Sequence, residues 1–191
     1  MKANYKNIYE RTKQMVLKPE IIWPQVLEED LTVKEIFRNY LLPITILTSV
    51  FVLLFSFINY TPWQAVGLAF INFISALTGT WFAYLITKEY LCGKLNYQDN
   101  QALNLTVYSS AVFIIFHGLG SALGNIFIGQ LFTLLSFIFI RTLYAGIGIL
   151  PSVSNGQKTN ILIIVSLAII CIPIIISQIL MIVFRISAIN V

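Results

Sequence analysis

The feature that most constrains this chain is the absence of charge from long stretches between Leu41 and Phe184. Five apolar stretches in this range contain one formal charge between them, Arg141, although the chain has 12 Lys and Arg and 8 Asp and Glu. An unpaired ion is costly in hydrocarbon, so charge exclusion on this scale indicates that lipid surrounds the fold. The sequence therefore predicts an integral membrane protein.

Each apolar stretch has about the 20 residues that a helix needs to cross the hydrocarbon layer. Short breaks rich in Pro, Gly and Asn separate the stretches. The predicted spans are residues 41–60, 63–87, 103–123, 127–150 and 161–184. We expect an all-α membrane protein with five transmembrane helices. Residues 1–40 would form a cytoplasmic or interfacial segment, and residues 41–191 the transmembrane domain.

Composition agrees with this class of protein, because 58% of the 191 residues are hydrophobic and only 10% are charged. The two cysteines, Cys92 and Cys171, fall in a predicted loop and in the middle of a predicted span. They should therefore lie at different depths, and we expect no disulfide framework.

Orientation follows from the Lys and Arg residues in the connections between spans. Ten lie on one side of the predicted membrane, and Arg185 alone lies on the other. The ten are Lys2, Lys6, Arg11, Lys13, Lys18, Lys34, Arg38, Lys88, Lys94 and Lys158. This bias predicts a cytoplasmic N-terminus and, after five spans, a C-terminus outside. The membrane would be the inner membrane of a bacterium or, in a eukaryote, that of the Golgi or the endoplasmic reticulum.

The polar N-terminal segment has the pattern of an amphipathic helix. Tyr5, Ile8, Tyr9, Met15 and Val16 recur at helical spacing among charged residues. We expect this helix to lie flat on the inner leaflet, held by apolar burial and by attraction between its cations and anionic lipid. The alternative is that it packs on the cytoplasmic loops of the protein itself.

A second helix is expected after this segment. Thr32 and Glu35 have the spacing of a capping box, which predicts a helix that starts near Val33 and runs into the first span, with a bend at Pro43.

Several short motifs together resemble the short bacterial proteins of the Yip1-domain family. They are residues 10–13 (Glu-Arg-Thr-Lys), residues 16–19 (Val-Leu-Lys-Pro), Trp23, residues 33–37 (Val-Lys-Glu-Ile-Phe), residues 40–43 (Tyr-Leu-Leu-Pro), residues 108–111 (Tyr-Ser-Ser-Ala) and residues 143–151, from Leu-Tyr-Ala to Leu-Pro. The resemblance extends over most of the chain and implies a five-span fold that associates with membranes and protein partners. The Asp-Leu-Tyr-Gly-Pro motif of the eukaryotic trafficking members is absent, and residues 39–43 stand roughly in its place. Binding of Rab GTPases is therefore not carried over.

Arg141 is the one charge inside a predicted span, about nine residues or near 14 Å from the cytoplasmic end of that span. A charge near the middle of the bilayer costs on the order of 3 kcal/mol, so this side chain should face protein or water. No Asp or Glu lies in any predicted span, which leaves hydroxyls, backbone carbonyls or a bound anion as partners.

One hypothesis is an inner-leaflet pocket in which Arg141 binds a lipid phosphate or another anion. Its residues would be Arg141, Tyr108, Ser109, Ser110, Thr80 and Tyr84. In the alternative, Arg141 snorkels to the cytoplasmic interface while its stem packs on neighbouring helices.

His117 is the one histidine of the chain, and Ser121 follows it by four residues on the same helical face. Hydrolytic dyads need groups that converge from separate elements, so we interpret His117 as a helix-packing residue. One histidine and two distant cysteines do not make up a zinc or di-iron site. We therefore expect neither a metal nor an organic cofactor, and no nucleic-acid module is recognisable.

Other residues in the spans favour close contact between helices. Ser75 and Gly79 have small-xxx-small spacing, Pro173 lies midway along the last span, and Asn72 is suited to an interhelical hydrogen bond.

Taken together, these features favour a non-enzymatic membrane protein of the Yip1 type that acts through lipid organisation or as a scaffold. Its partners would be membrane lipids, including anionic headgroups, and protein partners or further copies of the chain. The alternative function is a small transporter or permeation protein with a polar pocket around Arg141.

Overall fold

The computed structural model describes residues 5–124, 127–151 and 153–186. These residues form helices, with no strand among them. In chain order the helices are α1 (Tyr5–Leu17), α2 (Pro19–Leu27), α3 (Val33–Ile36), the π-helix η1 (Phe37–Leu41), α4 (Leu42–Ser56), α5 (Pro62–Lys88), the π-helix η2 (Glu89–Lys94), α6 (Asp99–Leu123), α7 (Phe127–Leu135), α8 (Ile138–Ile149) and α9 (Asn155–Val183).

Among the described residues, five helical stretches are long and apolar enough to cross a membrane, which agrees with the predicted all-α fold of five spans. They are Val33–Ser56, Pro62–Lys94, Asp99–Leu123, Phe127–Ile149 and Asn155–Val183. Each overlaps a predicted span, but four begin or end in polar sequence beyond the predicted limits. The predicted boundary at residue 40 lies inside the first helical stretch.

Capping boxes explain where three of these stretches begin. Thr32, Thr61 and Ser154 each accept a hydrogen bond from the backbone N–H three residues later. The Glu or Gln at that later position reaches back to the backbone N–H of the capping residue. Each pair satisfies backbone groups that the first turn of a helix leaves unpaired. The predicted start near Val33 is confirmed.

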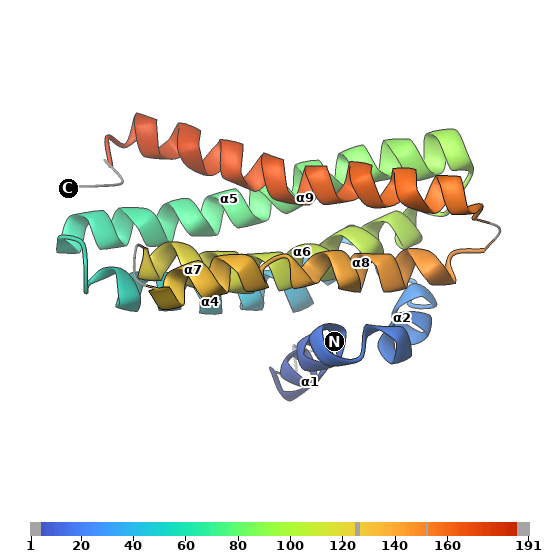
Figure 1. Cartoon of the computed structure of the whole chain (residues 1–191), viewed down its shortest axis with the longest axis horizontal. Coiled ribbons are helices and arrows are strands. Elements are labelled where there is room, and N and C mark those ends of the chain that lie inside the picture. The colour runs from blue at the N-terminus through green and yellow to red at the C-terminus, as the bar shows by residue number, and fades with distance from the viewer. Residues whose placement is uncertain (1–4, 125–126, 152, 187–191) are drawn as a thin grey trace.

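The long helices run side by side along the bundle, with α6 at its centre (Figure 1). Of the 18 most apolar consecutive residues in α6, 78% are buried, against 33 to 39% in the other candidate spans. Helix α6 carries the polar residues Asn104, Thr106, Tyr108, Ser109 and Ser110, all of them buried. Because lipid cannot satisfy such groups, this helix is enclosed by its neighbours.

Large apolar side chains cover the outside of the bundle. Phe51 on α4, Phe82 on α5, Leu134 on α7 and Ile182 on α9 are all at least 40% exposed. Exposure of aromatic and aliphatic side chains all around a bundle is expected where the surrounding solvent is lipid.

The cation-bearing connections lie at a common end of the bundle. Figure 1 shows α2, η2, the last turn of α8 and the first turn of α9 toward one end, and the turn between α4 and α5 at the other. Lys88, Lys94 and Lys158 therefore lie at the end near which α2 is also found. The connections between the long helices thus alternate between the two ends of the bundle, as the count of Lys and Arg requires. Which compartment each end faces is a prediction from that count.

Helices α5 and α9 approach closely at one small residue. A Cβ placed on Gly79 would lie 2.5 Å from Cγ and 2.8 Å from Cα of Pro173. The proline ring thus occupies the space that a side chain at Gly79 would need. The predicted small-residue contact serves packing within the chain here.

The N-terminal segment does not lie apart from the bundle. Met15, Trp23 and Val26 are fully buried. Trp23 donates its indole N–H to the carbonyl of Thr142 at 2.7 Å, and the Thr142 hydroxyl lies 3.1 Å from the carbonyl of Met15. The prediction of an interfacial helix is not confirmed, because much of the apolar face of α1 and α2 packs on α6 and α8. These contacts are with helices at the side of the bundle. They differ from the alternative prediction, in which the segment packs on the loops.

Candidate functional site

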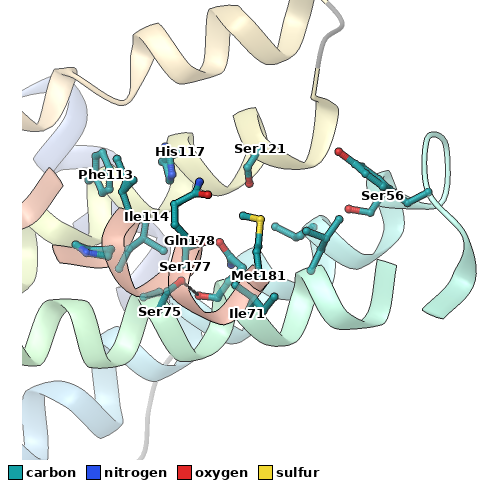
Figure 2. Close-up of a pocket in the computed structure, with 17 residues that line it drawn as sticks. Ser56, Ile71, Ser75, Phe113, Ile114, His117, Ser121, Ser177, Gln178 and Met181 are labelled. Carbon is teal, nitrogen blue, oxygen red and sulfur yellow. Dashed lines mark hydrogen bonds between the residues drawn. The ribbon is translucent and has the colours of Figure 1, made fainter. Parts of the chain in front are cut away.

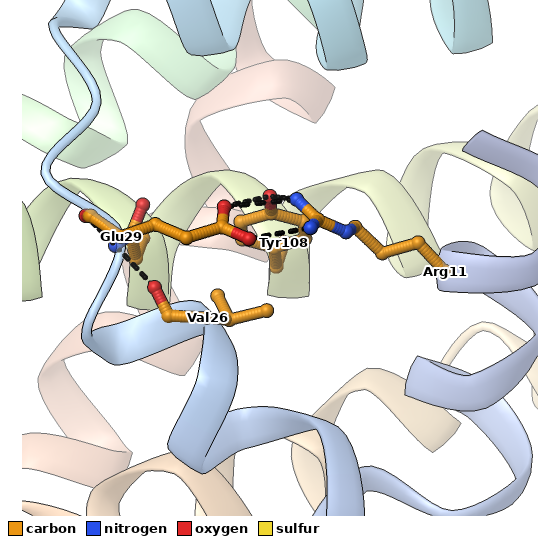
Figure 3. Close-up of polar contacts among 5 residues, drawn as sticks. Arg11, Val26, Glu29 and Tyr108 are labelled. Atoms are coloured by element: carbon orange, nitrogen blue, oxygen red, sulfur yellow. Dashed lines mark hydrogen bonds and ion pairs between the residues drawn. The ribbon is translucent and has the colours of Figure 1, made fainter. Parts of the chain in front are cut away.

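The N-terminal cap, defined as α1, α2 and the connection up to Leu31, is joined to the bundle by a charged network. Arg11 donates to a carboxylate oxygen of Glu29 at 2.9 Å and to the hydroxyl of Tyr108 at 2.6 Å (Figure 3). The second guanidinium nitrogen of Arg11 forms an ion pair with the other carboxylate oxygen of Glu29. Side chains from α1, from the connection after α2 and from α6 therefore converge at one point.

Tyr108 is the centre of this network. Its side chain is fully buried, and the guanidinium carbon of Arg11 lies 5.6 Å from the centre of its ring. The rings of Tyr40 and Trp23 lie 4.4 and 6.2 Å away, the latter edge-on. The aromatic rings and the cation hold the cap, the first span and α6 together.

Asn104, one helical turn before Tyr108, fixes the end of α2. Its amide nitrogen donates to the carbonyls of Val26 at 2.8 Å and Glu29 at 3.3 Å. These bonds tie α6 to carbonyls at the end of α2 and just after it, and the Val26 carbonyl also accepts the backbone N–H of Glu29 at 3.2 Å. Asn104 and Tyr108 thus form a polar stripe on α6 that the cap covers.

The protonation state of Arg11 follows from its surroundings. Burial alone would lower the pKa of Arg11, but the hydrogen bond to Glu29 and the electrostatic attraction of Tyr108 and of the Glu29 carboxylate more than offset it and raise the pKa. The guanidinium is therefore charged at every physiological pH. The link between cap and bundle is an ionic one.

The structure gives Arg141 a partner that the sequence analysis did not consider. Its guanidinium donates to a carboxylate oxygen of Glu20 on α2 at 3.3 Å. More than half of each side chain is exposed, 57% for Arg141 and 61% for Glu20. No carboxylate lies in the spans as predicted from sequence, but the cap lies against the bundle and brings one to this cation.

The six residues of the predicted anion pocket do not form one cluster. Arg141 is exposed beside Glu20, whereas Tyr108 is buried with Arg11 and Glu29. Trp23 separates these two groups, because its ring packs on Tyr108 while its N–H bonds the residue after Arg141. Among the described residues, Arg141 and Tyr108 therefore have different neighbours.

The remaining members of that predicted set have other surroundings. Thr80 donates to a carbonyl of its own helix, and Tyr84 donates to Asp99 at 2.7 Å. Ser109 and Ser110 are buried, and their hydroxyls have no hydrogen-bond partner among the described residues.

A second polar region is a cavity of about 260 Å³ among α4, α5, α6 and α9 (Figure 2). Its wall reaches from Ser56 and Met181, near one end of the bundle, to Phe113 and Pro173, close to the middle. The polar residues of the wall are Ser56, Tyr60, Asn72, Ser75, His117, Ser121, Ser177 and Gln178. The wall carries no formal charge, so the cavity suits water or a neutral polar molecule.

Three residues of this cavity have informative surroundings. The Ser56 hydroxyl is fully buried and has no hydrogen-bond partner among the described residues. Asn72 donates to Ser49 at 3.1 Å, which confirms its predicted interhelical bond. His117 stacks on Phe113 with ring centres 4.8 Å apart, in keeping with a packing role.

Sequence reasoning missed Arg11, Glu29, Asn104 and Glu20. One signal was available, since Asn104 and Tyr108 are four residues apart and share a helical face. Nothing in the sequence links the cap carboxylates to a particular span. Within the described ranges, no group of three or more His, Cys, Asp and Glu residues is placed to hold a metal ion.

Comparison of the chain with protein-family models, with curated proteins and with solved structures finds no match.

Proposed function

We propose that this chain is a non-enzymatic integral membrane protein that organises inner-leaflet lipid around its bundle, in the manner implied by the resemblance to the Yip1 type. The membrane would be the bacterial inner membrane, with the cap on its cytoplasmic side. The observation that carries the proposal is the outward face of the docked cap, which presents apolar and cationic side chains together.

The apolar part of this face is exposed despite the docking. Tyr9, Leu17 and Ile21 are 63, 58 and 63% exposed, whereas Met15 and Trp23 beside them in the chain are fully buried. Exposed Lys13 and Lys18 lie among these apolar residues in sequence. A helix surface that combines bulky apolar side chains with lysines binds the boundary between headgroups and acyl chains, most strongly in anionic membranes.

The depth of the cap supports the same function. Thr142, which bonds α1 and α2, lies eight residues or about 12 Å from the Leu150 end of its helix. The cap therefore runs along the side of the bundle at the level of one leaflet. Its outer face would displace lipid from α6 and α8 and offer its own lysines to the surrounding headgroups.

Extraction of the protein with its surrounding lipid tests this function. We expect polymer discs cut from vesicles of phosphatidylcholine and phosphatidylglycerol to be enriched in phosphatidylglycerol around the wild-type protein. Replacing Lys13 and Lys18 by Gln and Leu17 and Ile21 by Ser should remove the enrichment. Arg185→Gln, at the opposite end, is the control. Lipid of bulk composition around the wild-type protein would contradict the proposal.

A second candidate function, permeation of a neutral solute, is favoured by the polar cavity with its unpaired Ser56 hydroxyl. The polar pocket of this candidate is then the cavity of Figure 2 and not the surroundings of Arg141. Swelling of proteoliposomes in glycerol tests it. Permeation predicts swelling faster than that of protein-free vesicles and slowed by Asn72→Leu, but unchanged by Arg141→Leu. Swelling at the rate of protein-free vesicles would exclude it.

A further inference from the structure

A shallow apolar groove lies between the start of the first span and α5, on the outer surface of the bundle. Its volume is about 630 Å³. The walls include Phe37, Leu42, Leu77 and Trp81, and Lys34 and Arg38 also line it. The ring of Phe37 meets Trp81 edge-on at 5.7 Å, while Trp81 remains 42% exposed. The groove thus has an aromatic wall that is open to the surroundings.

The two cations belong to one face of the helix. Lys34 and Arg38 are four residues apart, so their side chains project from the same side. Both are exposed, and neither forms an ion pair with a carboxylate in the part of the chain that the structure describes. The nearby carboxylate of Glu35 accepts hydrogen bonds from Thr32 in the capping box. Among the described residues, the charges of Lys34 and Arg38 are therefore not neutralised by an ion pair with a carboxylate.

The local backbone brings two further groove residues together. The N–H of Leu42 bonds the carbonyl of Phe37, five residues earlier, in the π-helix η1. A π-helical turn contains more residues than an α-helical turn, so side chains five apart come to nearly the same side. Such turns are rare and are frequently found at functional sites. Here the turn places Phe37 and Leu42 in one wall.

The depth of the groove matches that of a single leaflet. Trp81 lies seven residues or about 10 Å before Lys88, the last residue of α5. Lys34 and Arg38 lie at the start of the first candidate span. The groove therefore leads from the level of headgroups to the level of acyl chains, with its cations at the polar end.

We propose that this groove binds one anionic phospholipid of the inner leaflet, with an acyl chain along Trp81 and Leu42 and the phosphate between Lys34 and Arg38. The inference rests on the proposed lipid function and narrows it to one lipid class and one site. Charge complementarity selects the occupant, because an arginine and a lysine together offer a phosphate several charged donors. A zwitterionic lipid adds an ammonium group that these cations repel.

Quenching of tryptophan fluorescence by brominated lipid tests the site. The protein is prepared as Trp63→Phe, which removes an exposed indole in the first turn of α5, 18 residues before Trp81. Trp23 is fully buried and gives a constant background, while Trp81 reports the groove. Brominated phosphatidylglycerol should quench at a mole fraction lower than brominated phosphatidylcholine, by on the order of tenfold for two cations. Trp81→Phe should abolish the quenching.

The charge variants decide the outcome. In Lys34→Gln/Arg38→Gln the two quenching curves should coincide. Lys94→Gln/Lys158→Gln removes the same charge from the same end and should retain the preference. Equal quenching by the two lipids in the parent protein would overturn the site, because the groove would then not select an anionic headgroup. Selectivity that survives the Lys34 and Arg38 substitutions would also overturn it.

The disc experiment separates this failure from failure of the proposed function. Phosphatidylglycerol enrichment that persists without selective quenching refutes the groove and leaves the lipid function in place. Absence of phosphatidylglycerol enrichment around the wild-type protein refutes both the groove site and the proposed lipid function.

Discussion

Glu20 on α2 and Arg141 on α8 form an ion pair at 3.3 Å, although 121 residues separate them in the chain. The pair brings a carboxylate from the cap to the one cation inside the predicted spans. The aromatic side chains of Phe137 and Tyr144, near Arg141 in the chain, are exposed. A charge beside such an apolar surface is stabilised by an ion pair, and Glu20 supplies it. The position of the cap and the depth of the arginine are thus linked.

We predict that Glu20→Gln weakens the packing of the cap on the bundle, because it leaves the Arg141 cation without its carboxylate partner. We expect the variant to have a lower Tm than wild type in bicelles, and Arg141→Leu to be destabilised less because the charge it leaves, that of Glu20, lies on α2 of the cap and not within a candidate span. The double variant should resemble Arg141→Leu alone. Thermal unfolding followed by circular dichroism checks the order. Additive effects of the two changes would show that the residues do not interact.

The same pair predicts a dependence on pH. Backbone hydrogen bonding at the start of α2, together with Arg141, lowers the pKa of Glu20 from its ordinary value of 4.5. A lowered folded-state pKa contributes stability that is present above pH 4.5 and is lost as the pH falls through the folded value. The Tm difference between wild type and Glu20→Gln should therefore be constant from neutral pH to about pH 5 and shrink below it. A difference that grows on acidification would contradict this sign.

The Arg11 network predicts unequal effects of its members. Arg11→Leu leaves the carboxylate of Glu29 half-buried and unpaired, which should cost on the order of 2 kcal/mol. Tyr108→Phe removes one hydroxyl, keeps the ring and should cost about 1 kcal/mol. Amide hydrogen exchange in α1 checks both variants. Arg11→Leu/Glu29→Leu should cost less than the sum of the single changes, and a fully additive result would contradict the pairing.

The sequence was sufficient for the spans because their signals are local. Charge exclusion, the Thr32–Glu35 capping box and the break before Pro62 each depend on neighbouring residues, and all three correspond to features of the fold. The docking of the cap was not predictable in this way. Met15 and Tyr9 look alike in a helical pattern, yet one is fully buried and the other 63% exposed, because the contact is made with residues more than 90 positions away.

The candidate site shows the same limit. Position along a helix predicts the depth of a residue, but depth alone does not tell which face of a helix meets which neighbour. Trp23 packs on Tyr108 and bonds the carbonyl of Thr142, while Arg141 pairs with Glu20. Predicting their separation requires the position of α2, which the sequence of the spans does not contain.

The contact between Gly79 and Pro173 gives the most local prediction. A methyl group at Gly79 would lie within 2.8 Å of Cα and Cβ of Pro173, and a proline backbone in a packed helix has little freedom to yield. Gly79→Ala should therefore push α5 and α9 apart and cost roughly 1 to 3 kcal/mol, although alanine favours helix over glycine. Gly148→Ala is the matched control, because nothing lies within 4 Å of its added methyl group. There the same substitution should be neutral or raise the Tm. Equal Tm shifts for the two variants, measured in the same detergent, would show that α5 and α9 do not meet at Gly79.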